Sequence, residues 1–247
     1  EKAEDPARSL EEIRTLIDVS PGHEEGLALL ERILGMDDAP VPTRLGALGL
    51  LRTSYDAVKR EEDTVRVLEM AIQFTEGEEQ VNLRKEAGRR LANLEKWVES
   101  IGHFAALVKE RPADLDARRN LFRVAKRSGH NDLLASALME ASDACDDDIV
   151  QVHLLTEAAY LYKNDLQVPE TAIDLFTRVL HAEAADPRVK LNSAHVLNDL
   201  LAEVERSADR LAVLDQLAVL EQAESLRRAI IGEAGRLAEE IGDRDLA

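Results

Sequence analysis

Hydrophobic and small residues recur along this chain four and then three residues apart, which is the spacing of one face of an α-helix. The same trio of positions returns in four copies, Thr64/Leu68/Ala71, Ser100/Phe104/Leu107, Leu134/Leu138/Ala141 and Ala172/Phe176/Val179. The offsets between successive copies are 36, 34 and 38. A hydrophobic pattern that repeats at this period predicts stacked helix pairs, in which each unit contacts mainly its neighbours.

A second series of positions precedes each trio and predicts the first helix of each pair. Its members combine small and large residues, in the copies Leu51…Tyr55, Ala87-Gly88…Leu91, Leu121-Phe122…Ala125 and Ala158-Ala159…Tyr162. Small residues let two helices approach closely, and the large residue fills the space beside them. We therefore expect antiparallel helix pairs joined by short turns.

Residues that end helices separate these segments. They stand at Pro21-Gly22, Pro40, Pro42, Gly77, Pro112, Gly129, Pro169, Pro187 and Gly242. The composition agrees, because 45% of the residues are hydrophobic and only 3% are aromatic. Alanine, leucine, glutamate and arginine, which favour helix over strand, are abundant. The sequence predicts an all-α protein of about 12 to 13 helices.

The copy from Arg84 to Pro112 resembles the tetratricopeptide repeat, a helix–turn–helix unit of about 34 residues. Small, large, aromatic and helix-ending residues fall where that family places them, at Ala87, Gly88, Leu91, Trp97, Ser100, Phe104 and Pro112. The copies at 114–144 and 148–182 are weaker, and 187–222 matches least well. The resemblance implies a right-handed superhelical solenoid of antiparallel helix pairs. We expect Trp97 and Phe104 to be buried and Pro112 to mark the end of a second helix.

We expect a single solenoid over residues 1–247. Its units have approximate bounds of 7–35, 43–75, 78–111, 114–144, 148–182, 187–222 and 224–247, of which the first and sixth are irregular and the last is truncated. Ser9, Ile13 and Leu16 have the spacing of a second helix whose first helix is missing. Ala234-Gly235 followed by Gly242 resembles a first helix and its turn. These ends predict a fragment of a longer tandem-repeat protein of bacterial type; the alternative is a mature protein with irregular caps.

The charge of the chain limits its partners. It has 49 acidic and 31 basic residues and a formal net charge of −18, which disfavours binding to nucleic acid or to an anionic membrane. No run of 18 or more apolar residues predicts a membrane span. The one cysteine, Cys145, excludes an internal disulfide framework and is compatible with a reducing cytosol. We expect a cytoplasmic location, with any targeting segment outside these residues.

Basic residues gather in one segment despite the acidic excess. Six bases face only Asp114 and Asp116 there; they are Arg111, Arg118, Arg119, Arg123, Lys126 and Arg127. First helices of the family line a concave groove, and the resemblance assigns groove-facing positions to Lys85, Arg89, Arg119, Asn120, Arg123, Lys126 and Arg127. Because guanidinium groups pair well with carboxylates, these residues predict a strip that binds an acidic protein or peptide segment. The alternative is a solvated helix face, on which each ion pair contributes only about 0.2–1 kcal/mol.

Some members of the family bind the C-terminal carboxylate of chaperones through a two-carboxylate clamp. The resemblance places Lys85 and Asn120 at two clamp positions, but Arg89 stands where that clamp uses an amide. His153 and Glu157 stand where it needs two cations, and Glu157 would repel a carboxylate. The sequence therefore does not favour a chaperone co-receptor.

Patterns for catalysis and metal binding are weak. The histidines lie in different helical segments, and the chain has no HExxH, no Cys/His ligand spacing, no glycine-rich phosphate loop and no GxSxG. The run Asp146-Asp147-Asp148 lacks the alternating ligands and central glycine of a calcium loop. We expect it to cap the helix that begins near Ile149. The sequence predicts neither an enzyme nor a bound cofactor or metal.

Three classes of function remain open at this point. The leading one is a protein-interaction scaffold that binds a partner segment in the concave groove or along the ridge of the array. The second is a ligand- or peptide-responsive regulatory domain of a larger signalling protein. The third, an all-helical enzyme, would need clustered acids and bases around a closed pocket, which the sequence does not supply.

Overall fold

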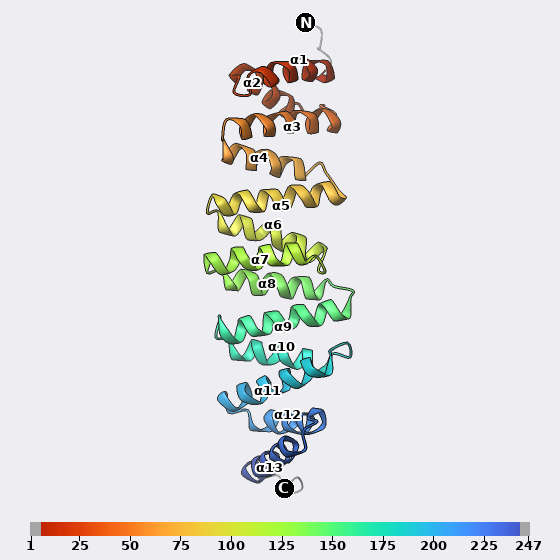
Figure 1. The fold of residues 1–247 in the computed structure, drawn as a ribbon, viewed down its shortest axis with the longest axis vertical. Coiled ribbons are helices and arrows are strands. Elements are labelled where there is room, and N and C mark those ends of the chain that lie inside the picture. The colour runs from red at the N-terminus through yellow and green to blue at the C-terminus, as the bar shows by residue number, and fades with distance from the viewer. Residues whose placement is uncertain (1–5, 243–247) are drawn as a thin grey trace. The chain divides into compact units, whose positions relative to one another are not determined.

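The computed structural model describes residues 6–242, and within that range the chain is entirely helical apart from short connections (Figure 1). The helices are α1 (Pro6–Val19), α2 (Glu24–Leu34), α3 (Val41–Ala57), α4 (Glu61–Ile72), α5 (Gly77–Asn93), α6 (Trp97–Glu110), α7 (Leu115–Ser128), α8 (Asn131–Asp143), α9 (Asp148–Asn164), α10 (Pro169–His181), α11 (Pro187–Glu203), α12 (Ser207–Leu220) and α13 (Glu224–Ile241). Described residues contain thirteen helices and no strand, which confirms the predicted all-α helical-repeat fold.

The chain divides into two compact units, residues 1–107 and 108–247, which are described separately. In the first unit, α2 packs on α3, α3 on α4 and α4 on α5, so that helices adjacent in sequence lie side by side (Figure 1). Fully buried side chains such as Leu30, Leu51, Leu68 and Phe104 fill the contacts between them. Each helix thus buries its apolar face against its neighbours in sequence, as in a repeat array.

The second unit is built in the same way. Consecutive helices from α7 to α13 pack on one another, and the apolar residues between them have little or no exposed surface. The largest of these include Leu121, Leu138, Leu154 and Phe176. Phe176 also makes an edge-to-face contact with Tyr160, with the ring centres 5.1 Å apart. Such pairs contribute about 0.5–1.5 kcal/mol beyond the surface that they bury.

A left-handed backbone turn recurs between the first and second helix of successive pairs. Its residues have φ between 55° and 80° and are Lys59, Glu95, Gly129, Gln167, Glu205 and Gly242. The intervals between them are 36, 34, 38, 38 and 37, and the first three equal the offsets of the hydrophobic trios. The turn is therefore a second, independent mark of the repeat, and it extends the repeat through residues 187–222, where the side-chain pattern is weakest.

Hydrogen bonding explains why the helices end at this turn. The amide of the residue after the left-handed position donates to a carbonyl five residues earlier, in Arg60→Tyr55 at 2.8 Å, Lys96→Leu91 at 2.9 Å and Arg206→Leu201 at 2.9 Å. This bond satisfies a carbonyl at the end of the helix in the manner of a Schellman motif. Glycine usually occupies the left-handed position, because a side chain there is strained.

The turn gives a first testable prediction. Glu205→Gly is expected to raise the free energy of unfolding by roughly 1 kcal/mol, because it relieves strain at φ 59°. Gly129→Ala at φ 80° is expected to lower it by a similar amount. Urea denaturation of both variants measures the two changes. Equal effects of the same sign would contradict the assignment of these residues to one turn type.

Ion pairs connect helices that are one repeat apart in the sequence. In the first unit, Arg52 pairs with Glu86 at 2.6 Å and Arg90 with Asp56 at 2.8 Å, each across 34 residues. In the second, Asp143 pairs with Arg178 at 3.1 Å across 35 residues. The pair of Asp143 and Arg178 is exposed, and an exposed pair contributes about 0.2–1 kcal/mol. Their separation, close to the repeat length, follows from the stacking of equivalent helices.

An ion pair of the same kind corrects the assignment of α1 and α2 to the first and second helix of a pair. Glu31 on α2 pairs with Arg66 on α4, 35 residues later, as Asp143 on one second helix pairs with Arg178 on the next. Helix α2 therefore occupies the place of a second helix, and α1 precedes it as the first. The prediction that Ser9, Ile13 and Leu16 form a second helix is wrong. Ile13 is buried, as a core position requires, but the side chain of Ser9 lies outside the described residues.

The predictions for buried residues and helix ends agree with the structure at Phe104 and Pro112 but not fully at Trp97. Phe104 is fully buried, and α6 ends at Glu110, just before Pro112, as expected. Trp97 is only half-buried, because it is the first residue of α6 and lies at the edge of the helix contact. Helix α13 ends at Ile241 and is followed by Gly242 in the left-handed conformation. The division of the chain into units of one right-handed solenoid stays a prediction.

Candidate partner-binding face

The seven residues predicted to bind a partner lie on two helices. Lys85 and Arg89 are on α5 in the first unit, and the other five, Arg119, Asn120, Arg123, Lys126 and Arg127, are on α7 in the second. Both helices hold first-helix positions, since the left-handed turns at Glu95 and Gly129 follow them.

On α5, the exposed base is Arg89, whereas Lys85 is half-buried. Both interact with other residues of the chain. The neighbouring Arg90 belongs to the structure rather than to a binding face, because it contacts Asp56, Glu61 and Glu86 at 2.8–3.0 Å. Burial alone would lower the pKa of Arg90, but its hydrogen bonds to Glu61 and Glu86 outweigh burial and raise it. Helix α5 thus offers a smaller basic surface than its composition indicates.

Helix α7 is amphipathic and well capped. Ala117, Leu121, Val124 and Ala125 are buried on one side. Asp114 begins the helix by accepting hydrogen bonds from the amides of residues 116 and 117 at 2.9 and 3.0 Å. The exposed side carries four bases, Arg119, Arg123, Lys126 and Arg127. Two of them, Lys126 and Arg127, stand in the last turn, where positive charge is favourable.

The Asn120 side chain is buried, and its hydrogen bonds lie within α7. Its Nδ2 donates to the carbonyl oxygen of Asp116 at 2.8 Å and to the carboxylate of that residue at 3.2 Å. Its Oδ1 accepts from the Arg123 guanidinium at 2.7 Å. Asn120 therefore orients Arg123, whose side chain remains exposed. We assign Asn120 a positioning role within the candidate face.

Two acidic residues, one in the middle of α9 and one just after its end, neutralise part of the basic segment, which the basic residues of α7 do not predict by themselves. Arg118, whose side chain is only 11% exposed, pairs with Glu157 at 2.5 Å. Lys126 pairs with Asp165 at 2.6 Å. In both pairs the acid follows the base at a sequence separation of 39, so an acid one repeat after each base was the available signal. The Glu157 carboxylate thus forms an ion pair within the protein, with Arg118.

What remains on the exposed side of α7 is a cluster of arginines. Arg119 is exposed and makes no hydrogen bond or ion pair with another described residue, and Arg123 is exposed and held by Asn120. Arg127 is exposed one turn further along and has an interaction of its own. We call Arg119, Arg123 and Arg127 the α7 arginine face. An arginine side chain can pair with a carboxylate through two parallel hydrogen bonds.

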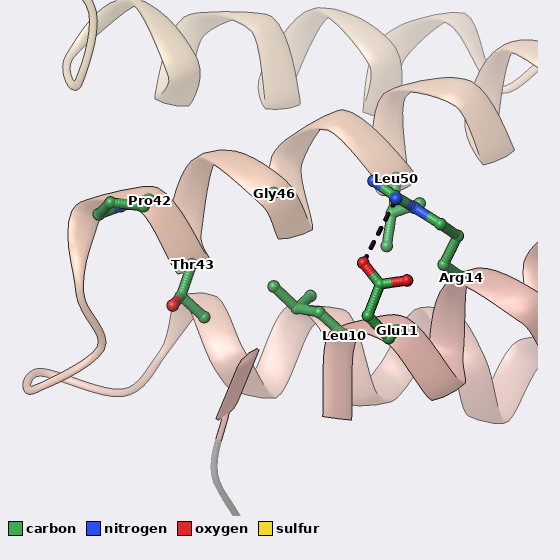
Figure 2. Close-up of a pocket in the computed structure, with 7 residues that line it drawn as sticks. All are labelled: Leu10, Glu11, Arg14, Pro42, Thr43, Gly46 and Leu50. Carbon is green, nitrogen blue, oxygen red and sulfur yellow. Dashed lines mark hydrogen bonds and ion pairs between the residues drawn. The ribbon is translucent and has the colours of Figure 1, made fainter. Parts of the chain in front are cut away.

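A hollow of about 270 Å³ lies between α1 and α3, bounded by Leu10, Pro42, Thr43, Gly46 and Leu50 (Figure 2). Glu11 and Arg14 pair at 3.3 Å at its rim (Figure 2). Its volume falls below the range of about 300–1,000 Å³ that is usual for small-molecule sites.

The aspartate run forms a helix cap, as the sequence predicts. Asp147 accepts hydrogen bonds from the amides of Ile149 and Val150, both at 3.0 Å, at the start of α9. Within residues 6–242, no group of three histidine, cysteine, aspartate or glutamate side chains is placed to hold a metal ion. Among the described helices, none combines the length and the apolar character needed to cross a membrane.

In the first unit, the His103 imidazole is largely buried and has a lowered pKa. Its side chain is 14% exposed, and Nε2 lies 3.5 Å from Glu69. Burial is the largest influence and lowers the pKa of His103 below 6.5; the hydrogen bond to Glu69 opposes it, and the charge of Arg84 adds to the lowering. We therefore describe the contact with Glu69 as a weak hydrogen bond of a neutral imidazole at pH 7.

This shift predicts acid sensitivity. In the unfolded chain His103 titrates near pH 6.5, whereas in the folded chain it takes up its proton only at lower pH. Below about pH 6.5 the unfolded state binds more protons, so stability falls as the pH drops toward the folded pKa and is constant above that range. In His103→Gln this part of the decline should be absent. Urea denaturation at several pH values measures the difference, and parallel curves for the two proteins would contradict it.

The fold defines the class of this chain as an all-α helical-repeat protein. No family model matches the sequence. No curated protein matches it either.

Two of the solved structures to which this chain is similar are described as having TPR-like repeats. A Podospora anserina protein assigned as a kinesin light chain, with nearly identical TPR-like repeats, is 19% identical, covers 73% of this chain and 97% of its own, and has a TM-score of 0.34. A point variant from the same source is 16% identical over 92% of this chain and 100% of its own, with a TM-score of 0.32. BtubC (BKLC) from P. vanneervenii is 13% identical over 96% and 89%, with a TM-score of 0.26. The fold assignment rests on the thirteen helices of the described residues and on the recurring left-handed turn.

Proposed function

We propose that this chain is a protein-interaction scaffold whose α7 arginine face binds an acidic segment of a partner protein. The observation that carries the proposal is the exposure of Arg119 and Arg123 on a first helix of the array. A repeat array presents long, regular surfaces that suit an extended partner segment. The resemblance to the tetratricopeptide repeat family, drawn from Arg84 to Pro112, supports the same function.

The chemistry of the face indicates the chemistry of the partner. The chain carries a net charge of −18, so a positive surface within it is a local exception that favours a negatively charged segment at that place. Arg123 is pre-oriented by Asn120, which lowers the cost of ordering the side chain on binding. Glu157 and Asp165 already neutralise Arg118 and Lys126, which leaves Arg119 and Arg123 to contact the partner.

A peptide array tests this proposal. The labelled 247-residue chain is applied to synthetic peptides of matched length that are acidic, neutral or basic, at low and at high salt concentration. We expect retention on acidic peptides that decreases as salt screens the charges. Selection of neutral apolar peptides with no dependence on salt would contradict the acidic-partner proposal.

We propose that the protein acts in the cytoplasm as a binding module without enzymatic activity. A ligand-responsive regulatory domain remains the second hypothesis from the sequence, and no contact in the described residues favours it over the scaffold.

A further inference from the structure

The first helices α7, α9 and α11 of the second unit can be aligned residue by residue. Each contains a small or apolar residue with no exposed surface, Leu121, Ala158 or Leu197. In α7 and α11 this residue precedes the left-handed position of the turn by eight residues, and in α9 by nine. The turn after α9 is one residue longer, because the Val168 amide donates to the carbonyl oxygen of Tyr162, six residues earlier, at 2.9 Å. The three buried residues therefore hold one position of the repeat.

Residues two and six positions after these buried residues form two rows in register across the three helices, and every member of both rows is exposed. The members are Arg123, Tyr160 and Asp199 in the first row and Arg127, Asn164 and Glu203 in the second. Both rows run from a base on α7, through an uncharged residue on α9, to an acid on α11. The exposed side of these helices thus changes from positive to negative in one direction along the array.

The three helices follow one another in the stack. Two ion pairs join α7 to α9 and to the residue just after it, Arg118 with Glu157 at 2.5 Å and Lys126 with Asp165 at 2.6 Å. Helix α10 packs on both α9 and α11 (Figure 1). The ion pairs also neutralise the two acids nearest to α7, so the negative end of the rows lies on α11.

The members on α9 and α11 can contact a partner. The Tyr160 side chain is 37% exposed, and its edge-to-face contact with Phe176 holds the ring in place. The carboxylate of Asp199 accepts one hydrogen bond, from the Asn198 side chain at 3.5 Å. Within residues 6–242, neither Asp199 nor Glu203 forms an ion pair. An ordered aromatic surface thus lies between arginines on one side and unpaired carboxylates on the other.

We propose that the two rows bind an extended segment of the partner in one orientation, with acids over α7, an apolar side chain against Tyr160, and bases beside Asp199 and Glu203. The inference rests on the proposed function, because the α7 arginine face supplies the positive end of the rows. Opposite charges at the two ends favour one orientation and oppose the reverse, in which like charges would meet. Packed helices lie about 8–10 Å apart, so an extended chain at about 3.3 Å per residue spans from α7 to α11 with about six residues.

A charge-swap experiment tests this inference. The probe is a fluorescent peptide with a pair of glutamates and a pair of lysines about six residues apart and a leucine midway. It is made in both chain directions, and the tighter-binding direction is kept. Fluorescence anisotropy is measured as the 247-residue chain is added. The test variant is Asp199→Lys with Glu203→Lys, and the matched control is Asp174→Lys with Asp215→Lys, which makes the same charge change at exposed positions of the second helices α10 and α12.

We expect at least about tenfold weaker binding by the test variant, because lysines of the chain would then face lysines of the peptide, and little change for the control. A peptide whose lysines are replaced by glutamates should bind the test variant better than the unaltered chain. Circular dichroism verifies that each variant keeps its helicity.

The central position is tested on both partners. Replacing the leucine of the peptide by serine should weaken binding to the chain about fivefold, as the loss of a partly buried apolar contact does. Tyr160→Phe keeps the ring and its contact with Phe176, so it should keep this difference between the two peptides. Tyr160→Ala removes the ring and should abolish the difference.

Unchanged binding by the test variant, or equal weakening by the test variant and its control, would overturn this inference. Tighter binding of a peptide whose acids and bases lie about twelve residues apart would also overturn it, because that separation suits a helix at about 1.5 Å per residue. The α7 arginine face stands in these cases as long as Arg119→Glu with Arg123→Glu weakens the binding of acidic peptides. If that double variant leaves their binding unchanged, the proposed function fails and this inference fails with it.

Discussion

Phe104→Ala is expected to lower the free energy of unfolding by about 3–5 kcal/mol. The Phe104 side chain has no exposed surface and lies between α6 and α5, against Gly88. Truncation removes its buried surface and leaves a cavity, because Ala cannot reach the backbone of Gly88. Phe104 is one of the two largest fully buried side chains of the described residues, together with Phe176, so this substitution should be among the most damaging in the chain.

Urea denaturation followed by circular dichroism measures this loss. The matched control is Val98→Ala on the same helix, where the side chain is 54% exposed and the effect should stay within about 0.5 kcal/mol. A loss below about 1 kcal/mol for Phe104→Ala would contradict the packing of α6 on α5.

Gly88→Ala is expected to destabilise the protein by about 1–3 kcal/mol, although alanine is the better helix former. The added Cβ would stand 2.8 and 2.9 Å from two ring carbons of Phe104, which is closer than carbon atoms approach without displacement. Glycine in a helix costs up to about 1 kcal/mol relative to alanine. The contact with Phe104 is therefore the reason that the chain tolerates this cost.

A double-mutant cycle separates the two contributions. Once Phe104 is truncated, the space beside Gly88 is open, and Gly88→Ala should become neutral or stabilising in the Phe104→Ala background. Gly102→Ala on α6 is the control for helix propensity, since no atom stands within 4 Å of its Cβ position, and it should stabilise by up to about 1 kcal/mol. Simple addition of the two losses would contradict the contact between Gly88 and Phe104.

The sequence predicts the helices well because the hydrophobic trios and the small residues report local packing directly. Ser100, Phe104 and Leu107 are all fully buried, as a shared helix face requires. Trp97 shows the limit of this reasoning. Its position in the motif is right, but it begins α6, and a residue at the end of a helix is covered by fewer neighbours than one in the middle.

The N-terminal helix could not be assigned from its own pattern. The spacing of Ile13 and Leu16 fits either member of a helix pair, because both kinds of helix bury one face. The pairing of Glu31 with Arg66 one repeat later decides the matter, since it identifies α2 as a second helix. Long-range ion pairs of this kind depend on which helices stack, and spacing within one helix does not contain that information.

The sequence identifies the basic segment of α7, but it does not show how many of these bases are paired with acids of the same chain. The number of bases left to contact a partner depends on acids that lie one repeat later in the chain, at a sequence separation of 39. Asn120 was predicted to face the groove, but its side chain is buried and hydrogen-bonded to Asp116 and Arg123, because an amide can satisfy both a carboxylate and a guanidinium. A search for acids one repeat after each base would have found Glu157 and Asp165.

The left-handed turn was also not predicted, for a physical reason. Glycine signals this conformation at Gly129 and Gly242, but Lys59, Glu95, Gln167 and Glu205 adopt it without any such signal. The helix packing on both sides imposes the turn at these residues and compensates for the strain. The backbone conformation therefore identifies this turn at all six positions, whereas glycine in the sequence identifies it at only two.

The proposal that the α7 arginine face binds an acidic segment is tested most directly by reversing its charge. The dissociation constant of the best acidic peptide is measured for the chain, for Arg119→Glu with Arg123→Glu, and for a control with Arg188→Glu and Arg236→Glu, two exposed arginines on other helices. Both variants change the net charge equally, and circular dichroism verifies that helicity is retained. We predict at least about tenfold weaker binding for the first variant and little change for the second. Unchanged binding by the first variant, or equal weakening by both, would contradict the proposed function.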